Sequence, residues 1–83
     1  MENERRIGFV GIILEDRARG AVAVNALLSS FGDRILARVG LPRAGTDCAV
    51  ITLVVEATTD ELGALTGRLG QIPGVSVKSA LSK

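Results

Sequence analysis

The sequence predicts an α+β domain in which a four-stranded antiparallel sheet carries two helices on one face, in the order β-α-β-β-α-β. Residues 7–14 and 48–56 are nearly uninterrupted apolar runs rich in β-branched side chains, as in strands with both faces covered. An amphipathic helical pattern follows each run. The second half also repeats the first, because "LEDRARGAVAVNALLSSFGDRILARV" and "VEATTDELGALTGRLGQIPGVSVKSA" place strand, cap, helix and strand in one order. We therefore expect one domain over residues 1–83.

The first half predicts a polar tail at residues 1–5 and a strand at 6–14. Asp16 offers a side-chain oxygen to cap a helix over 17–31. A second strand is expected at 34–41. The apolar stripe of the helix has the spacing i, i+3, i+4 and i+7, formed by Val24, Leu27, Leu28 and Phe31.

The second half predicts a strand at 48–57, a helix at 59–70 and a last strand at 74–81. Thr58 and Glu61 have the spacing of a capping box at the start of that helix. The chain turns into the last strand through a proline that ends the helix and a glycine that permits the bend, Pro73 and Gly74. The apolar stripe of this helix is Leu62, Leu65 and Leu69.

The stretch "GALTGRLGQIPGVSV", residues 63–77, is rich in glycine and has two interpretations. A phosphate-binding loop would place glycines before the helix, where unpaired backbone N–H groups point at the anion. Here Asp60 stands at that helix start and would repel phosphate. At about 100° per residue, Gly63, Gly67 and Gly70 instead cluster on one flank of the helix. They are predicted to be close-packing glycines, which let another segment approach.

The composition argues against several functions. Ten Lys and Arg against nine Asp and Glu leave a net charge of +1, and the charged residues are scattered along the sequence rather than clustered. This pattern disfavours direct nucleic-acid binding. The sequence contains no histidine, and one cysteine cannot form a transition-metal site, so we expect no metal, no cofactor and a buried structural thiol at Cys48. Acid-base catalysis would fall to Asp16 or Asp60, both better explained as helix-start residues, so no enzyme is expected.

The longest apolar run, residues 7–14, is too short to span a bilayer, and the acidic start MENE is unlike a signal peptide. We expect a cytoplasmic chain that does not engage a membrane.

Three stretches resemble a known family: "LEDR" at 14–17, "RVGLP" at 38–42 and "TTDELGALTGRLGQIPGVSVKSA" at 58–80. They are similar to small proteins described as regulators of the iron-only hydrogenase system. That family is similar in fold to ACT domains and to the C-terminal metal-sensing domain of the nickel-responsive repressor. The resemblance implies a ferredoxin-like, ACT-like sandwich. It does not carry over the repressor's histidine-based metal site, and we expect no DNA-binding domain.

The ACT resemblance implies a small-molecule effector near the loop after the first strand, at a subunit boundary. The corresponding ligand-binding residues here are Glu15, Asp16, Arg17 and Gly20, without the usual proline. Arg38 is a second candidate, because it interrupts an apolar strand and its guanidinium can hold a carboxylate. The alternative is that Asp16 only caps the helix, Arg17 is solvated and Arg38 lies at an exposed edge.

The first and third expected strands are apolar on both faces, and two helices cover only one face. We therefore expect a homo-oligomer, either a dimer or an assembly of dimers, which an aspartate at an open-face position such as Val10 or Val54 would disrupt. The predicted function is that of a small ACT-like regulatory or ligand-sensing protein. The alternative is an oligomerisation or protein-interaction module with no effector.

Overall fold

The fold, in a computed structural model, is described for residues 4–42 and 47–83; residues 1–3 of the expected polar tail lie outside this range. The elements follow the predicted order, and no boundary differs from the expected one by more than one residue. A short 3₁₀ helix between the first helix and the second strand was not predicted. The elements are β1 (Arg6–Leu14), α1 (Arg17–Ser30), η1 (Gly32–Arg34), β2 (Ile35–Pro42), β3 (Ala49–Ala57), α2 (Thr59–Gly70) and β4 (Val75–Leu81).

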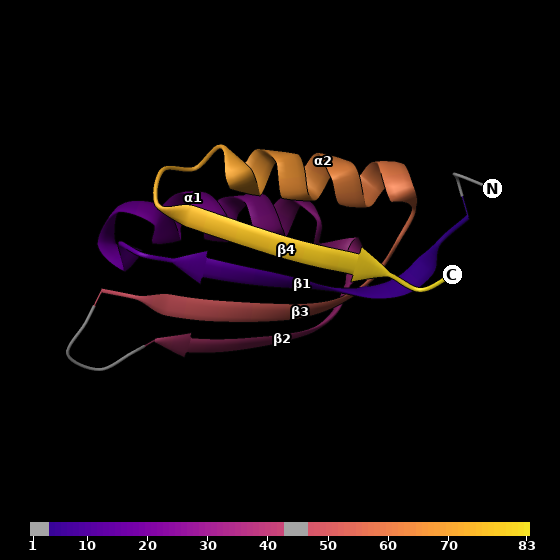
Figure 1. Cartoon of the computed structure of the whole chain (residues 1–83), viewed down its shortest axis with the longest axis horizontal. Coiled ribbons are helices and arrows are strands. Elements are labelled where there is room, and N and C mark those ends of the chain that lie inside the picture. Colours follow the sequence, from indigo (N-terminus) through magenta and orange to yellow (C-terminus); the bar gives the residue numbers. More distant parts are fainter. Residues whose placement is uncertain (1–3, 43–46) are drawn as a thin grey trace.

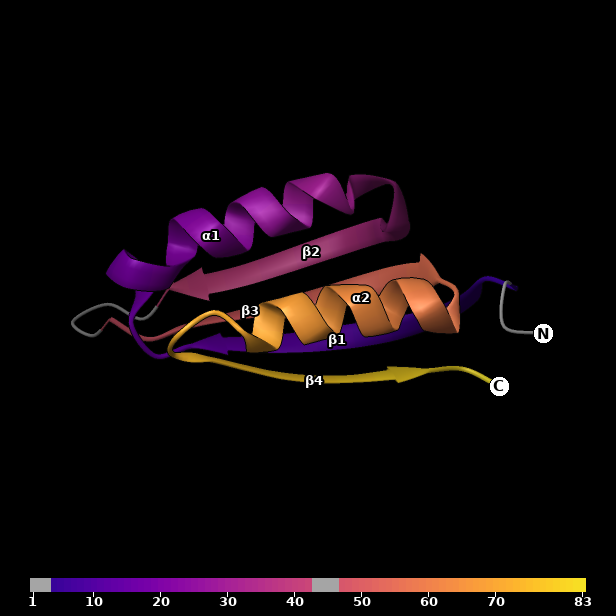
Figure 2. The ribbon, with the colours of Figure 1, turned by 90° about the horizontal axis from the view of Figure 1, so that it is seen from above.

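The four strands form one antiparallel sheet in the order β2-β3-β1-β4. Both helices lie on the same face of this sheet (Figure 1). Seen from the helix side, α2 lies over β1 and beside β4, whereas α1 lies toward the β2 edge (Figure 2). The predicted ferredoxin-like α+β fold is confirmed.

Each helix begins at the cap that the sequence predicts. The Asp16 side chain accepts a hydrogen bond from the backbone N–H of Arg19 at 3.2 Å, which satisfies one of the unpaired amides at the start of α1. Thr58 and Glu61 form the expected capping box of α2. At the other end of α2, Gly74 has a φ of 79°, a conformation that favours glycine and turns the chain into β4.

The core fills the space between the helices and the sheet. Its strand residues alternate along β1 and β3, as expected when every second side chain points to one face. The helices contribute two buried residues each from the predicted stripes. The fully buried large side chains of this layer include Val10, Ile12, Leu14, Leu53, Val55, Val24, Leu28, Leu65 and Leu69.

The strand register fixes which residues face the helices. Directly paired residues of neighbouring strands point to the same side of a sheet, and Val10 pairs with the buried Leu53. The expectation that Val10 lies on the open face is therefore wrong. Both sets of alternating residues in β1 are apolar, so the sequence does not distinguish the side that the helices cover. Val54, by contrast, does lie on the open face, opposite Phe9.

The open face of the sheet is strongly apolar. Among the described residues, seven large apolar side chains on this face are between 40% and 67% exposed. They come from the three adjacent strands β2, β3 and β1. Within the part of the chain that the structure describes, β1 and β3 are thus covered on one side only. This set, called the open apolar face below, consists of Ile7, Phe9, Ile13, Val39, Leu41, Val50 and Val54.

Candidate functional site

The turn between β1 and α1 carries four of the predicted ligand-binding residues, and several of their backbone groups have structural partners. The backbone N–H of Glu15 donates to the carbonyl oxygen of Gly74 at 2.8 Å. That of Arg17 donates to the carbonyl oxygen of Asp47 at 2.7 Å. These two hydrogen bonds hold the turn to both the α2–β4 and the β2–β3 connections, and the Asp16 side chain caps α1.

Gly20 is buried inside α1 rather than placed at a ligand-accessible surface. A methyl group built on it would lie 3.6 Å from Leu14 Cδ2 and 3.9 Å from Ile72 Cγ2, which are ordinary packing distances. A methyl group would therefore fit at this position without displacing a neighbour, so the packing of α1 on the core does not require glycine here.

Arg38 lies on the helix side of β2, because it pairs with the buried Leu53. Its Nη2 donates a hydrogen bond to Oδ1 of Asn25 on α1 at 2.6 Å. This contact orients the guanidinium across the gap between helix and strand. A guanidinium has five N–H donors, so Asn25 leaves most of them available.

Arg17 and Arg38 meet at a cavity of about 180 Å³ between α1 and the β2–β3 part of the sheet. The cavity exists because β2 presents Gly40 to the helix side, opposite Ile51, and in the described part of the chain no atom lies within 4 Å of a methyl group built on Gly40. Its apolar wall includes Leu14, Val24 and Ile51. Neither Glu15, Asp16 nor Gly20 is part of its lining.

The structure thus places two of the five predicted ligand-binding residues, Arg17 and Arg38, in the lining of one cavity, to which the other three do not contribute. Sequence reasoning missed Asn25 and Gly40. The available signal was that Arg38 interrupts an apolar strand, but no spacing rule connects it to Asn25, which is 13 residues away in the chain.

The glycine flank of α2 is exposed. Within the described part of the chain, no atom lies within 4 Å of a methyl group built on Gly63 or Gly67, and Gly70 approaches only Val77 Cγ1, at 4.0 Å. No other element of the described chain packs closely on the first two. Their predicted role in close packing would therefore require a partner molecule, and it stays a prediction.

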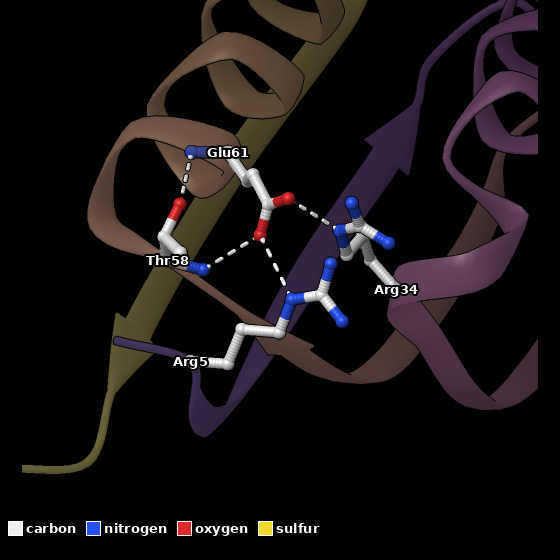
Figure 3. A network of polar contacts seen from close by, with 4 residues as sticks. All are labelled: Arg5, Arg34, Thr58 and Glu61. Carbon is white, nitrogen blue, oxygen red and sulfur yellow. Dashed lines mark hydrogen bonds and ion pairs between the residues drawn. The ribbon is translucent and has the colours of Figure 1, made fainter. Parts of the chain in front are cut away.

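A second polar cluster surrounds Glu61 (Figure 3). One carboxylate oxygen accepts from the backbone N–H of Thr58 at 2.9 Å and lies 3.7 Å from Arg5 Nε. The other accepts from Arg34 Nε at 2.5 Å. The Thr58 N–H, followed by the two arginines, lowers the pKa of Glu61 below its usual value of 4.5, although desolvation opposes the shift. These contacts join the N-terminal segment, η1 and α2, which is a structural role.

Cys48 is partly buried and immediately precedes β3, so the thiol is less enclosed than expected. Residues 4–42 and 47–83 contain no group of three or more His, Cys, Asp or Glu side chains arranged to hold a metal ion. No helix within these ranges is long and apolar enough to cross a membrane.

A family model described as "TM1266-like: Iron-only hydrogenase system regulator, putative" matches residues 6–79. Among proteins with curated descriptions, none matches the sequence.

Similar folds occur among solved structures. The uncharacterized protein TM1266 from Thermotoga maritima has 44% sequence identity and a TM-score of 0.90, over 96% of this chain and 100% of that one. The ACT domain of the GTP pyrophosphokinase of Chlorobium tepidum has a TM-score of 0.77 at 22% identity, over 92% and 99%. The C-terminal domain of the MgtC protein of Mycobacterium tuberculosis has a TM-score of 0.65 at 24% identity, over 99% and 92%. The last two similarities concern the fold alone.

Proposed function

The chain belongs to the TM1266-like family, and we propose from this premise that it is a small regulatory protein that acts in trans on the expression or maturation of an iron-only hydrogenase. The family description supports the hydrogenase connection, and the ACT-like fold supports regulation rather than catalysis. The chain does not act on DNA directly in this proposal. Its effect passes through a protein partner.

The protein works as a homo-oligomer in this proposal, and the open apolar face is the observation that carries it. Fully burying an exposed large side chain contributes roughly 1.5–3 kcal/mol, and a side chain that is already half-buried contributes about half of that. Seven such half-buried side chains on each of two copies together offset an association cost of ~4–15 kcal/mol. The face also carries a Phe9 side chain that protrudes beside Gly11, where a hollow of about 290 Å³ opens.

A small effector is the second part of the proposal. The cavity between α1 and β2 supports it, because two arginines and an apolar wall meet there. The open apolar face by itself favours the other candidate, an interaction module that oligomerises without an effector. A thermal-shift screen against small metabolites separates the two, because an effector that binds only the folded state raises the unfolding temperature by mass action.

The regulatory role is tested in cells. Removal of the chain from its native host is expected to change the amount of hydrogenase transcript or of matured hydrogenase, and the Val54→Asp variant is expected to fail to restore it. If transcript and matured enzyme are both unchanged without the chain, the proposed regulation is wrong.

A further inference from the structure

The cavity between α1 and β2 has a lining that specifies a ligand chemistry, which extends the effector part of the proposed function. The charged part of the lining is cationic, because it consists of Arg17 and Arg38. Much of the remaining lining is apolar and includes Leu14, Val24 and Ile51. A ligand that satisfies both parts of the lining has an anionic group and a short hydrocarbon body.

The anionic end is best matched by a carboxylate. The guanidinium of Arg38 is already oriented by its 2.6 Å hydrogen bond to Asn25, so less side-chain freedom is lost when it binds. A planar guanidinium presents paired N–H donors that fit a carboxylate in a bidentate manner. The side chain of Arg17 makes no hydrogen bond or ion pair with residues 4–42 or 47–83, so its guanidinium is available to the same anion.

The lining also argues against an α-amino acid. Among residues 4–42 and 47–83, no Asp or Glu lines the cavity, and the Oδ1 atom of Asn25 already accepts a hydrogen bond from Arg38. An α-ammonium group would therefore lie beside two arginines without an anionic partner. Like charges placed next to one another repel, and an ammonium group without an anionic partner loses favourable solvation on binding.

We propose that this cavity binds a small aliphatic carboxylate that lacks an α-ammonium group. Arg38 and Arg17 hold the carboxylate, and the hydrocarbon chain lies on Leu14, Val24 and Ile51. Gly40 is the residue that keeps the cavity open, since a side chain at this position of β2 would occupy it.

The test is an NMR titration of the isotope-labelled full chain with isovalerate, isovaleramide, leucine and inorganic phosphate. Isovalerate is expected to shift the backbone signals of residues 21–25 and 38–40 in a saturable manner. The amide and leucine are expected to bind at least about tenfold more weakly, because one lacks the charge and the other adds an unpaired ammonium. Phosphate is expected to bind more weakly than isovalerate because it leaves the apolar wall exposed.

Two variants and one control locate the site. Arg38→Gln is expected to weaken isovalerate binding about tenfold or more. Gly40→Leu is expected to abolish it while the remaining spectrum shows a folded chain. Arg19→Gln is the matched control, since Arg19 is an exposed α1 arginine outside the lining, and it should bind as the wild type does.

Equal binding of leucine or phosphate, or isovalerate binding that survives Gly40→Leu, overturns the proposal. Absence of isovalerate binding also overturns it. The effector function as a whole is tested separately. If a different metabolite stabilises the chain by binding to another surface, the effector function is supported but this cavity is not its site. If the metabolite screen finds no stabilising compound at all, the effector function fails with it.

Discussion

Phe9 of β1 and Val54 of β3 are directly paired across the sheet, and both side chains lie on the face that neither helix covers. They are 52% and 40% exposed, although the residues next to them in sequence, Val10 and Leu53, are fully buried. Both faces of the same strand pair therefore carry large apolar side chains, but only one face is covered by the helices. The proposed self-association follows from this difference.

The first prediction concerns Val54. Val54→Asp places a charge in the centre of the open apolar face and is expected to shift the protein toward monomer, because burying an unpaired carboxylate is unfavourable. The control is Val22→Asp, since Val22 is 80% exposed on α1, away from this face. Sedimentation velocity and circular dichroism on both variants distinguish dissociation from unfolding. An unchanged association state in a folded Val54→Asp variant would contradict the proposed interface.

A second prediction concerns the exposed glycine flank of α2. Gly67→Ala is expected to raise the free energy of unfolding by about 0.5–1 kcal/mol, because alanine favours the helix and nothing described in the chain lies within 4 Å of the added methyl group. Urea unfolding at fixed protein concentration measures it. A loss of stability accompanied by weaker association would instead place a partner against this flank.

The capping box of α2 gives a third prediction. Thr58→Ala removes the hydroxyl that accepts from the backbone N–H of Glu61 at 3.0 Å. We expect the free energy of unfolding to fall by about 0.5–2 kcal/mol, as for other N-cap substitutions. Ser29→Ala, at an exposed α1 position, is the control and should change stability little. Equal urea midpoints for the wild type and Thr58→Ala would show that the cap does not matter.

The fourth prediction concerns pH. Because the folded-state pKa of Glu61 is lowered below 4.5, its ionised form stabilises the fold at pH values above the unfolded pKa. That stabilisation is lost as the pH falls through the lowered folded-state pKa. Glu61→Gln is therefore expected to be less stable than the wild type at neutral pH, with a difference that shrinks on acidification below pH 4.5. Thermal unfolding across this range measures it, and a difference that is constant with pH would contradict the assignment.

Much of the fold could be predicted because local signals agreed with one another. The β-branched runs marked β1 and β3, and the Thr58–Glu61 spacing gave the start of α2. The side of β1 that faces the helices could not be predicted, since Val10 and Phe9 belong to equally apolar sets. That choice depends on how the helices cross over the sheet.

The candidate cavity was less predictable than the fold. Arg17 and Arg38 were identified as candidate ligand-binding residues, but their meeting depends on the position of α1 above β2, which no local pattern encodes. Asn25 and Gly40 contribute to the cavity only because α1 lies above β2. Asn25 orients Arg38, and Gly40 leaves the space of the cavity unfilled. In sequence, an asparagine on a helix and a glycine in a strand are common and carry no such signal.

The most direct test of self-association through the open apolar face is light scattering on the purified wild-type chain at micromolar concentration. The account predicts a mass at least twice that of the 83-residue chain. Its cause is an apolar surface larger than soluble monomers usually expose. A mass equal to one chain, maintained as the concentration is raised, would contradict it.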